Sequence, residues 1–145
     1  MKNAVKLLAA ALILGASLSG PAAATGEPET CTTRGLAGRW MFATDVGHQA
    51  RFPGGDITAI GIFRIDRMGT ILDGNFDATV EGFRFLPGIT FTGSVVVSAN
   101  CTGTLTFVTS AGTTRTDSII VLGSGHIRGM SQDVNNLWTY DMRRL

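Results

Sequence analysis

Three alternating polar side chains are the residues whose spacing best suits acid–base chemistry. Asp73, Asn75 and Asp77 lie two positions apart, so in a strand they share one face. The pattern favours an outward, solvated face, which turns Leu72, Gly74 and Phe76 towards the interior. Pointing inward instead, beside Arg64 or Tyr140, the carboxylates would suit proton transfer of the cyclisation or isomerisation kind. A buried acid of this sort needs a partner or a raised pKa.

Metal and nucleophile chemistry has less support. A mononuclear zinc site needs about three or four ligands, and no spacing motif joins His48 and His126 to such a set. No Gly-x-Ser-x-Gly elbow occurs, and Ser124 lies in a Gly-Ser-Gly run that is typical of a hairpin turn. We therefore predict no metal and no cofactor, and the residues favour a binding protein over an enzyme.

The first 24 residues have the pattern of a secretory signal peptide. Lys2 and Lys6 form a basic start, Leu7 to Leu18 is apolar, and Ala22 to Ala24 end in a small-x-small cleavage signal. The alternative is an uncleaved anchor, but the apolar stretch is shorter than the ~20 residues that span a bilayer. The sequence predicts a protein that is secreted or periplasmic.

Cleavage would leave 121 residues, which suits one domain. The remaining chain has ten arginines, no lysine and eleven acidic residues, so its net charge is near −1. The remaining chain lacks the basic stripe that would indicate nucleic-acid binding. It also lacks a second apolar run that would indicate membrane insertion after signal cleavage. Chemistry that depends on a lysine amine is excluded from this part of the chain.

Cys31 and Cys101 make an even count, and in an exported chain a disulfide is the expected state. Two free thiols are the alternative, although neither cysteine has the local signature of a catalytic thiol. A bridge would tie a polar N-terminal tail, residues 25–37, to the domain that follows.

Short β-rich runs separated by Gly, Asn and Asp fill residues 38–145, which we assign to a single β-barrel domain. Most of the links are short enough for hairpins, so an eight-stranded antiparallel up-and-down barrel of calycin-like type is predicted, with a β-sandwich as the alternative. The links His48–Asp56 and Thr79–Gly88 are expected to be longer loops, with Phe83–Leu86 either a short extra strand or part of the second link. The expected strands are Arg39–Asp45, Ile57–Asp66, Thr70–Ala78, Ile89–Ser98, Gly103–Thr109, Thr114–Leu122, His126–Gln132 and Leu137–Arg143.

Alternation along these strands selects the residues that face the lumen. If Trp40 points inward, Phe42 shares its side, and Arg144 rather than Arg143 shares parity with the aromatic residues of the last strand. Leu105 is a further candidate on the fifth strand. The predicted lumen and ligand-binding residues are Trp40, Phe42, Phe63, Phe76, Phe107, Trp138 and Tyr140.

The two ends of the predicted barrel resemble the calycins, a group that includes lipocalins and avidins. Gly38-Arg39-Trp40 opens the first strand and Arg143-Arg144 closes the last. In calycins a Gly-x-Trp packs across the closed end of the barrel, and a basic side chain from near the last strand lies over the indole. The resemblance therefore implies that Arg144 covers Trp40, where it would gain cation–π attraction.

A longer pattern is similar to a group of small secreted bacterial proteins with calycin-like or allene-oxide-cyclase-like barrels. The matching pieces are Gly38, Trp40 and Phe42, the turn Phe63–Gly69, and Gly93–Thr106 with its Asn-Cys-Thr-Gly-Thr-Leu-Thr run. The resemblance spans nearly all of the chain after residue 24, and it departs from the group at Arg67-Met68 and in the long Thr79–Gly88 link. It implies the fold and export, and it implies no activity.

Together these features predict a secreted barrel that binds a small apolar or amphipathic ligand. One alternative is a cyclase or isomerase that uses the lumen, and another is an exported structural or interaction protein whose lumen is filled. A cavity of at least ~300 Å³ would favour binding or catalysis. An inward acidic residue beside Tyr140 or His126 would favour an enzyme.

Overall fold

The computed structural model of the protein describes residues 31–49, 55–80, 84–133 and 136–145. The predicted signal peptide, residues 1–24, and the first part of the predicted tail, residues 25–30, lie outside the described residues. Among the described residues, no helix has the length and hydropathy needed to cross a bilayer.

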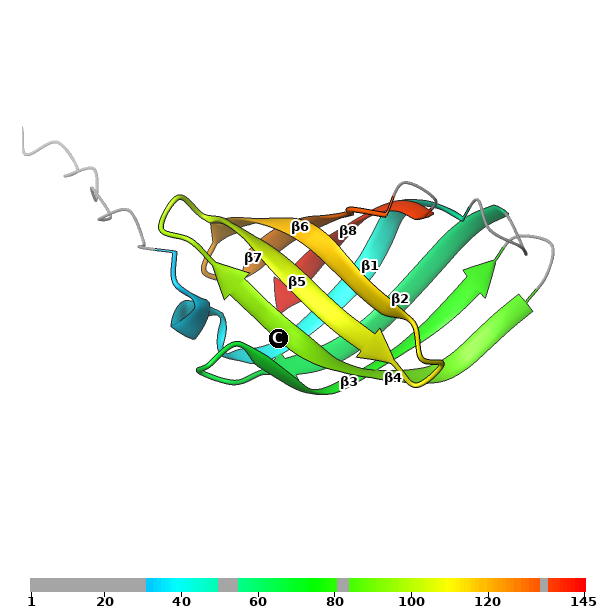
Figure 1. Cartoon of the computed structure of the whole chain (residues 1–145), viewed down its shortest axis with the longest axis horizontal. Coiled ribbons are helices and arrows are strands. Elements are labelled where there is room, and N and C mark those ends of the chain that lie inside the picture. The colour runs from blue at the N-terminus through cyan, green and yellow to red at the C-terminus, as the bar shows by residue number, and fades with distance from the viewer. Residues whose placement is uncertain (1–30, 50–54, 81–83, 134–135) are drawn as a thin grey trace, which may run out of the picture.

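Eight antiparallel strands close into a barrel in which each strand pairs with its neighbours in sequence and β8 returns to β1 (Figure 1). The predicted up-and-down barrel is therefore confirmed, and the β-sandwich alternative is wrong. The strands are β1 (Gly38–Gln49), β2 (Gly55–Ile65), β3 (Thr70–Val80), β4 (Arg84–Val97), β5 (Thr102–Thr109), β6 (Thr114–Gly123), β7 (His126–Ser131) and β8 (Asn136–Arg144).

Successive connections alternate between the two ends of the barrel. The short 3₁₀ helix η1 (Thr33–Leu36) and the C-terminus lie at one end, together with the β2–β3, β4–β5 and β6–β7 turns. We call this the disulfide end. The β5–β6 turn lies at the opposite end, where β1, β3 and β7 end and β2, β4 and β8 begin; we call this end the mouth.

Glycines within the strands make room for aromatic rings. A Cβ on Gly129 would lie 2.1 Å from Cζ of Tyr140, and one on Gly74 would lie 2.4 Å from the ring of Phe91. A Cβ on Gly61 would lie 2.6 Å from Cε1 of Phe42. Eight strands enclose a narrow interior, and aromatic rings that pack directly against glycine backbone can fill it.

Strand β3 contains a bulge that overturns part of the expected alternation. Ile71 pairs with Gly93 and Gly74 with Phe91, so β3 carries one residue more than β4 over this stretch. Leu72 and Asp73 both point outward as a result, and Leu72 is 46% exposed. The expectation that Leu72 faces the interior was wrong, whereas the buried Gly74 and Phe76 regain the inward face after the bulge.

Strand β4 begins earlier than expected, at Arg84, and takes in half of the segment Thr79–Gly88 that was predicted as a long link. Pro87 lies where the β3–β4 register shifts, between the pairs Phe76–Ile89 and Ala78–Leu86. A proline has no N–H to donate to a ladder, so a shift of register is where a strand can hold one. The Gly88 N–H instead donates to Asp77 Oδ1 at 2.7 Å.

The disulfide end is closed by η1. Leu36 is buried, and its carbonyl accepts a hydrogen bond from the Trp40 indole at 2.8 Å. Trp40 is fully buried, and the Arg144 guanidinium lies over its ring at 5.1 Å from the centroid. Arg144 also donates to the Gly35 carbonyl, so one side chain ties β8 to η1 and caps the core.

The predicted Cys31–Cys101 disulfide is present, and it links the chain before η1 to the β4–β5 turn. The Val97 N–H also donates to Thr33 Oγ1 at 3.0 Å, so η1 is held to β4 by a second contact. Both contacts hold η1, which closes this end, against the barrel.

Removing the bridge by replacing Cys31 and Cys101 with serine should lower the free energy of unfolding by about 4 kcal/mol, because the bridge closes a long loop in the unfolded chain. The two cysteines are 70 positions apart. Urea denaturation of the double variant and the wild type measures the difference. A loss of less than about 1 kcal/mol would contradict the prediction.

Replacing Arg144 with alanine should destabilise the protein more than replacing Arg143. Arg144 loses its contact with the Trp40 face and its bond to Gly35, together about 1–2 kcal/mol. Arg143 is exposed on the outer face, where such a change costs within about 0.5 kcal/mol. Parallel urea titrations of the two variants test the order, and the reverse order would contradict the role given to Arg144.

Candidate functional site

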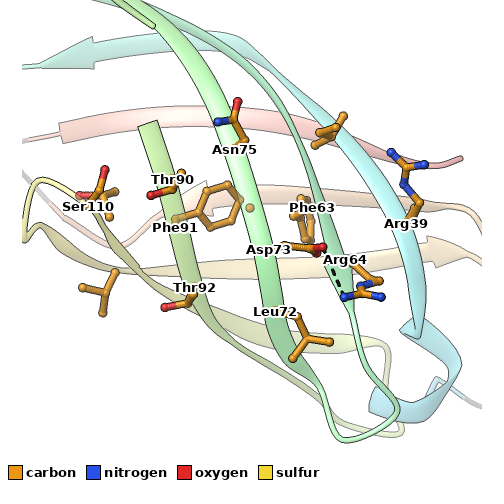
Figure 2. A pocket seen from close by; sticks show the side chains of 14 residues that line it. Arg39, Phe63, Arg64, Leu72, Asp73, Asn75, Thr90, Phe91, Thr92 and Ser110 are labelled. Atoms are coloured by element: carbon orange, nitrogen blue, oxygen red, sulfur yellow. Dashed lines mark ion pairs between the residues drawn. The ribbon is translucent and has the colours of Figure 1, made fainter. Parts of the chain in front are cut away.

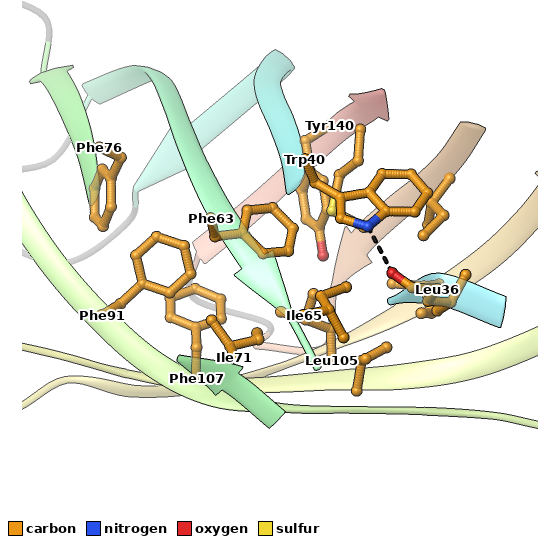
Figure 3. Close-up of a cluster of buried hydrophobic side chains, with 14 of the residues drawn as sticks. Leu36, Trp40, Phe63, Ile65, Ile71, Phe76, Phe91, Leu105, Phe107 and Tyr140 are labelled. Carbon is orange, nitrogen blue, oxygen red and sulfur yellow. Dashed lines mark hydrogen bonds between the residues drawn. The ribbon is translucent and has the colours of Figure 1, made fainter. Parts of the chain in front are cut away.

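The middle of the lumen is an aromatic cluster (Figure 3). Phe91 lies at its centre, with ring centroids 5.6 Å from Phe107, 5.8 Å from both Phe63 and Phe76, and 6.2 Å from Phe42. The rings are tilted or edge-on, which is the arrangement that aromatic quadrupoles favour.

All seven predicted lumen residues belong to this interior or pack against it. Trp40, Phe63, Phe76, Phe107, Trp138 and Tyr140 are buried, and Phe42 is half-buried against them. Trp40 occupies the disulfide end and Trp138 lies near the mouth end of β8. Whether any of them binds a ligand stays a prediction.

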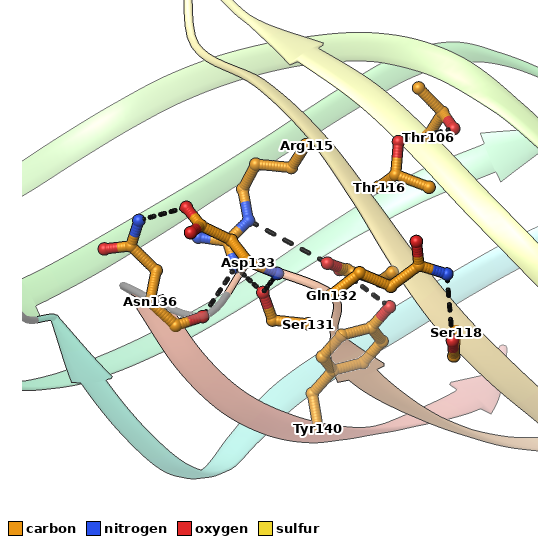
Figure 4. A network of polar contacts seen from close by, with 10 residues as sticks. Thr106, Arg115, Thr116, Ser118, Ser131, Gln132, Asp133, Asn136 and Tyr140 are labelled. Atoms are coloured by element: carbon orange, nitrogen blue, oxygen red, sulfur yellow. Dashed lines mark hydrogen bonds and ion pairs between the residues drawn. The ribbon is translucent and has the colours of Figure 1, made fainter.

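Trp138 is covered at the mouth by an arginine that the sequence analysis did not select. The Arg115 guanidinium lies 3.8 Å from the centroid of the Trp138 ring. Its Nη2 donates to Ser131 Oγ at 2.8 Å and to the Asn136 carbonyl at 3.5 Å (Figure 4). The barrel therefore has an arginine stacked on a tryptophan at each end.

A buried carboxylate lies deeper on the same strand. Asp117 is fully buried, and its Oδ2 accepts a hydrogen bond from the Tyr140 hydroxyl at 3.0 Å. Its Oδ1 lies 3.9 Å from Arg115 Nε, which is close enough for an ion pair and too far for a hydrogen bond. We call Arg115, Asp117, Ser131, Trp138 and Tyr140 the mouth cluster.

Within the part of the chain that the structure describes, three polar atoms of the mouth cluster are buried without a hydrogen-bond partner. They are Arg115 Nε, Asp117 Oδ1 and Trp138 Nε1. Buried polar atoms nearly always have a partner, and leaving one unpaired costs about 1–3 kcal/mol. Three such atoms in one cluster mark the place in the described structure that is best prepared for a polar group from outside.

The void beside these atoms is small. It measures about 30 Å³ and is lined by the aromatic cluster together with Asp117, Trp138 and Tyr140. That volume holds about one water molecule. The lumen is therefore filled by side chains in the described structure, and the cavity of at least ~300 Å³ that would favour binding or catalysis is not present there.

Burial dominates the electrostatics of the cluster. It raises the pKa of the Asp117 carboxyl, against the opposing effects of the Arg115 charge and the Tyr140 hydrogen bond. Burial, followed by the charge of Asp117, raises the pKa of Tyr140 well above 10.0, so the hydroxyl keeps its proton. Burial lowers the pKa of Arg115 from its usual range, with Asp117 and Asp133 acting in the opposite direction. A guanidinium nevertheless stays charged at neutral pH.

The sequence analysis missed Arg115, Asp117 and the central Phe91. On β6 the inward residues are Arg115, Asp117, Ile119 and Val121, while Ile120 and Leu122 face outward. Because both faces of β6 carry apolar residues, alternation does not show which face points inward. The charged residues Arg115 and Asp117 would by themselves suggest that their face points outward. The sequence analysis names an inward acid beside Tyr140 as the mark of an enzyme, and Asp117 is such an acid. A search of the acidic residues with that criterion could have found it.

The other acid–base candidates lie apart from the mouth cluster. Asp73 and Asn75 are exposed on the outer face, and the His126 ring pairs with Asp141 at 2.6 Å, also on the outside. His48 pairs with Asp56 at 3.3 Å, both exposed. Within the described residues, no group of three or more His, Cys, Asp or Glu side chains is arranged to hold a metal ion.

Two open hollows lie outside the lumen. One, of about 790 Å³, runs across the outer face of β2–β5 beside the β3 bulge, where Arg64 pairs with Asp73 at 3.4 Å (Figure 2). The other, of about 600 Å³, lies at the disulfide end beside Cys31, Cys101 and Arg144. Neither is lined by a buried polar atom that lacks a partner.

Replacing Asp117 with asparagine should change how stability depends on pH. Because the pKa of Asp117 is raised in the folded state, the folded protein holds this proton more tightly than the unfolded chain. Its contribution to stability is present below the unfolded pKa of about 3.9 and is lost as pH rises through the folded pKa. The free energy of unfolding of the wild type, relative to the variant, should therefore fall from acid towards neutral pH and then level off.

Urea titrations of both proteins between acid and neutral pH measure this difference. Asp66 and Asp141 have lowered pKa values and titrate in both proteins, so their effects cancel. Arg115 and Tyr140, which lie beside Asp117, keep their charge states across this range. Asp133, whose charge acts on Arg115, is present in both proteins. A difference that stays flat with pH, or rises, would contradict the raised pKa.

Comparison with known proteins finds likeness at the level of structure. No family model matches the chain and no curated protein matches it. A de novo designed fluorescence-activating β-barrel matches with a TM-score of 0.54 and 12% identity, over 78% of this chain and 96% of that one. The redesigned barrel mFAP1 bound to DFHBI matches at 0.53 and 17% identity, over 78% and 98%. EF1p2_mFAP2b bound to DFHBI matches at 0.53 and 13% identity, over 79% and 100%. At these identities the likeness concerns the barrel fold.

Proposed function

We propose that the protein binds a small molecule in the mouth half of its barrel. The observation that carries this proposal is the set of three buried, unpartnered polar atoms in the mouth cluster. A ligand that supplies their missing hydrogen bonds gains about 1–3 kcal/mol for each atom it satisfies, since their desolvation cost is already part of the unliganded fold.

The unpartnered atoms define the polar end of the ligand. Trp138 Nε1 and Arg115 Nε are donors, and Asp117 Oδ1 is an acceptor. A neutral group that both accepts and donates, such as a hydroxyl, an enol or an amide, suits all three. A carboxylate on the ligand would be repelled by Asp117. The charge of Arg115 is already balanced by two acidic neighbours, Asp117 and Asp133.

The surrounding rings define the rest of the ligand. The void is lined by five phenylalanines, so the body that enters it has to be apolar and flat. A molecule larger than the 30 Å³ void needs side chains to move. Arg115 is the side chain placed to move, because it covers Trp138 at the mouth and is still 12% exposed to solvent.

A second candidate function follows from the small void. A barrel filled by its own side chains can act through its outer surface, as an exported structural or interaction protein. The 790 Å³ hollow across β2–β5 is where such a partner would find polar groups such as Asn75 and Thr92 (Figure 2).

The setting of either function is proposed to be outside the cytoplasm. The Cys31–Cys101 disulfide suits an oxidising compartment, and the first 24 residues have a signal-peptide pattern. We further propose that the chain belongs to the small secreted bacterial calycin-like barrels. The Trp40–Arg144 stack and the closed eight-stranded barrel support that proposal.

Tryptophan fluorescence tests ligand binding, because the chain has only two tryptophans and Trp138 lies in the mouth cluster. The protein is titrated with 2-indanone, with 1-naphthol, and with DFHBI, which two of the similar designed barrels hold. At least one probe should give a saturable change in the wild type. The change should persist in Trp40→Phe and disappear in Trp138→Phe.

These two variants are matched controls, since each removes one indole from one end of the barrel. No saturable change with any of the three probes would contradict lumen binding and favour the filled barrel. A change that survives in Trp138→Phe and vanishes in Trp40→Phe would place binding at the disulfide end.

A further inference from the structure

The unpartnered atoms of the mouth cluster are of two complementary kinds. Trp138 Nε1 is a hydrogen-bond donor and Asp117 Oδ1 is a carboxylate acceptor, and both residues line the same void. Arg115, the cation of the cluster, lies 3.9 Å from that acceptor. A donor for an oxygen that gains charge, next to a carboxylate free to take a proton, is the arrangement that proton abstraction beside a carbonyl needs.

We propose that the mouth cluster catalyses proton transfer at a carbon next to a ketone carbonyl, with Asp117 as the general base. This inference rests on the proposed function, because the ketone must first bind in the lumen. The ketone oxygen would accept a hydrogen bond from Trp138 Nε1–H, and Asp117 Oδ1 would contact the hydrogen on the adjacent carbon.

The step balances without a further reactant. The C–H bond breaks and its proton forms an O–H bond with Asp117, while the C–H electron pair becomes the C=C bond of an enolate. The carbonyl π pair moves onto the oxygen, where the Trp138 donor and the Arg115 charge stabilise it. Return of the proton to the same carbon gives exchange, and return to a conjugated carbon gives an isomer.

The contacts of Asp117 suit this role. The Tyr140 hydroxyl holds Oδ2 at 3.0 Å and leaves Oδ1 without a partner. Tyr140 is therefore a positioning residue, and its high pKa keeps it a donor. Burial raises the pKa of Asp117, which makes its carboxylate a stronger base than an exposed aspartate.

The lumen supplies the dry surroundings. Asp117 is fully buried, pairs with Leu105 on β5 and lines the void together with the aromatic cluster. Charge on an enolate is stabilised more strongly by a fixed donor in such surroundings than in water.

Deuterium exchange tests the inference. The protein is incubated in D₂O with 2-indanone, and loss of the methylene signal next to the carbonyl is followed by proton NMR. Wild-type protein should accelerate exchange over buffer by on the order of 10²-fold. Asp117→Asn keeps the shape of the side chain and should return exchange to the buffer rate. Asp45→Asn changes an exposed aspartate that pairs with Arg128 outside the lumen, and it should leave the wild-type rate unchanged.

The pH profile separates a positioning role of Tyr140 from a merely structural one. The wild-type rate should rise with pH as Asp117 ionises and then level off. Because the Tyr140 hydrogen bond lowers the pKa of Asp117, Tyr140→Phe should move the midpoint to higher pH. A Tyr140→Phe midpoint that is unchanged, or lower, would overturn the positioning role.

Binding is measured in the same samples through Trp138 fluorescence, so the two proposals can fail separately. Binding of 2-indanone without accelerated exchange would overturn the catalytic inference and leave the binding function intact. Exchange by Asp117→Asn at the wild-type rate would overturn the role of Asp117. A wild-type protein that neither binds 2-indanone nor accelerates its exchange would overturn both proposals for ketones.

Discussion

The closure of eight strands on themselves is the constraint from which the other features follow. Once β8 pairs with β1, alternate residues of every strand must share one narrow interior, and each must find room among the others. Aromatic rings fill most of this space, and the strand glycines Gly61, Gly74 and Gly129 are where the rings press against the backbone. A charged residue on an inward position of such a barrel cannot reach bulk water along its whole length. Arg115 and Asp117 are therefore forced into contact with Trp138 and Tyr140.

The two ends of the barrel solve the same problem in different ways. Each has an arginine over a tryptophan, which shields the indole face and keeps the cation at the rim. At the disulfide end the Trp40 N–H has a partner in Leu36, and η1 is fastened by the disulfide. At the mouth the Trp138 N–H has no partner, and Arg115 is held by hydrogen bonds that a long side chain can exchange. The disulfide end is therefore closed by an indole with a hydrogen-bond partner and a helix fastened by a disulfide, whereas among the described residues the indole at the mouth has no such partner.

The fold could be predicted from the sequence because alternation and turn residues repeat regularly along the chain. All eight strands follow from that pattern, the Cys31–Cys101 bridge from the even cysteine count, and the Trp40–Arg144 contact from the calycin resemblance. Alternation fails where a bulge adds a residue, so Leu72 was placed on the wrong face. Phe91 was missed although alternation marks it, since it is buried between Thr90 and Thr92, which are both exposed.

The candidate site was harder to predict, because its members look like surface residues. Arg115 and Asp117 lie in a run with Thr114, Thr116 and Ser118, and a polar strand start of this kind is usually solvated. What places them inside is the register of β6 between β5 and β7, which pairs Asp117 with Leu105 and with Ser131. Register depends on contacts between distant parts of the chain, and a single sequence carries little of that information.

The cost of the mouth cluster is the strongest physical reason to assign it a function. A buried ion pair contributes little net stability, and well-packed apolar residues of similar size often stabilise a core more. The contact between Arg115 and Asp117 is weaker still, since 3.9 Å leaves both facing atoms without a hydrogen bond. Packing alone would be served better by an apolar side chain at position 117, as at most of the other buried positions of this barrel. The proposed binding of a small molecule would offset this cost, because the ligand would supply partners for the two donors and the acceptor that lack them among the described residues.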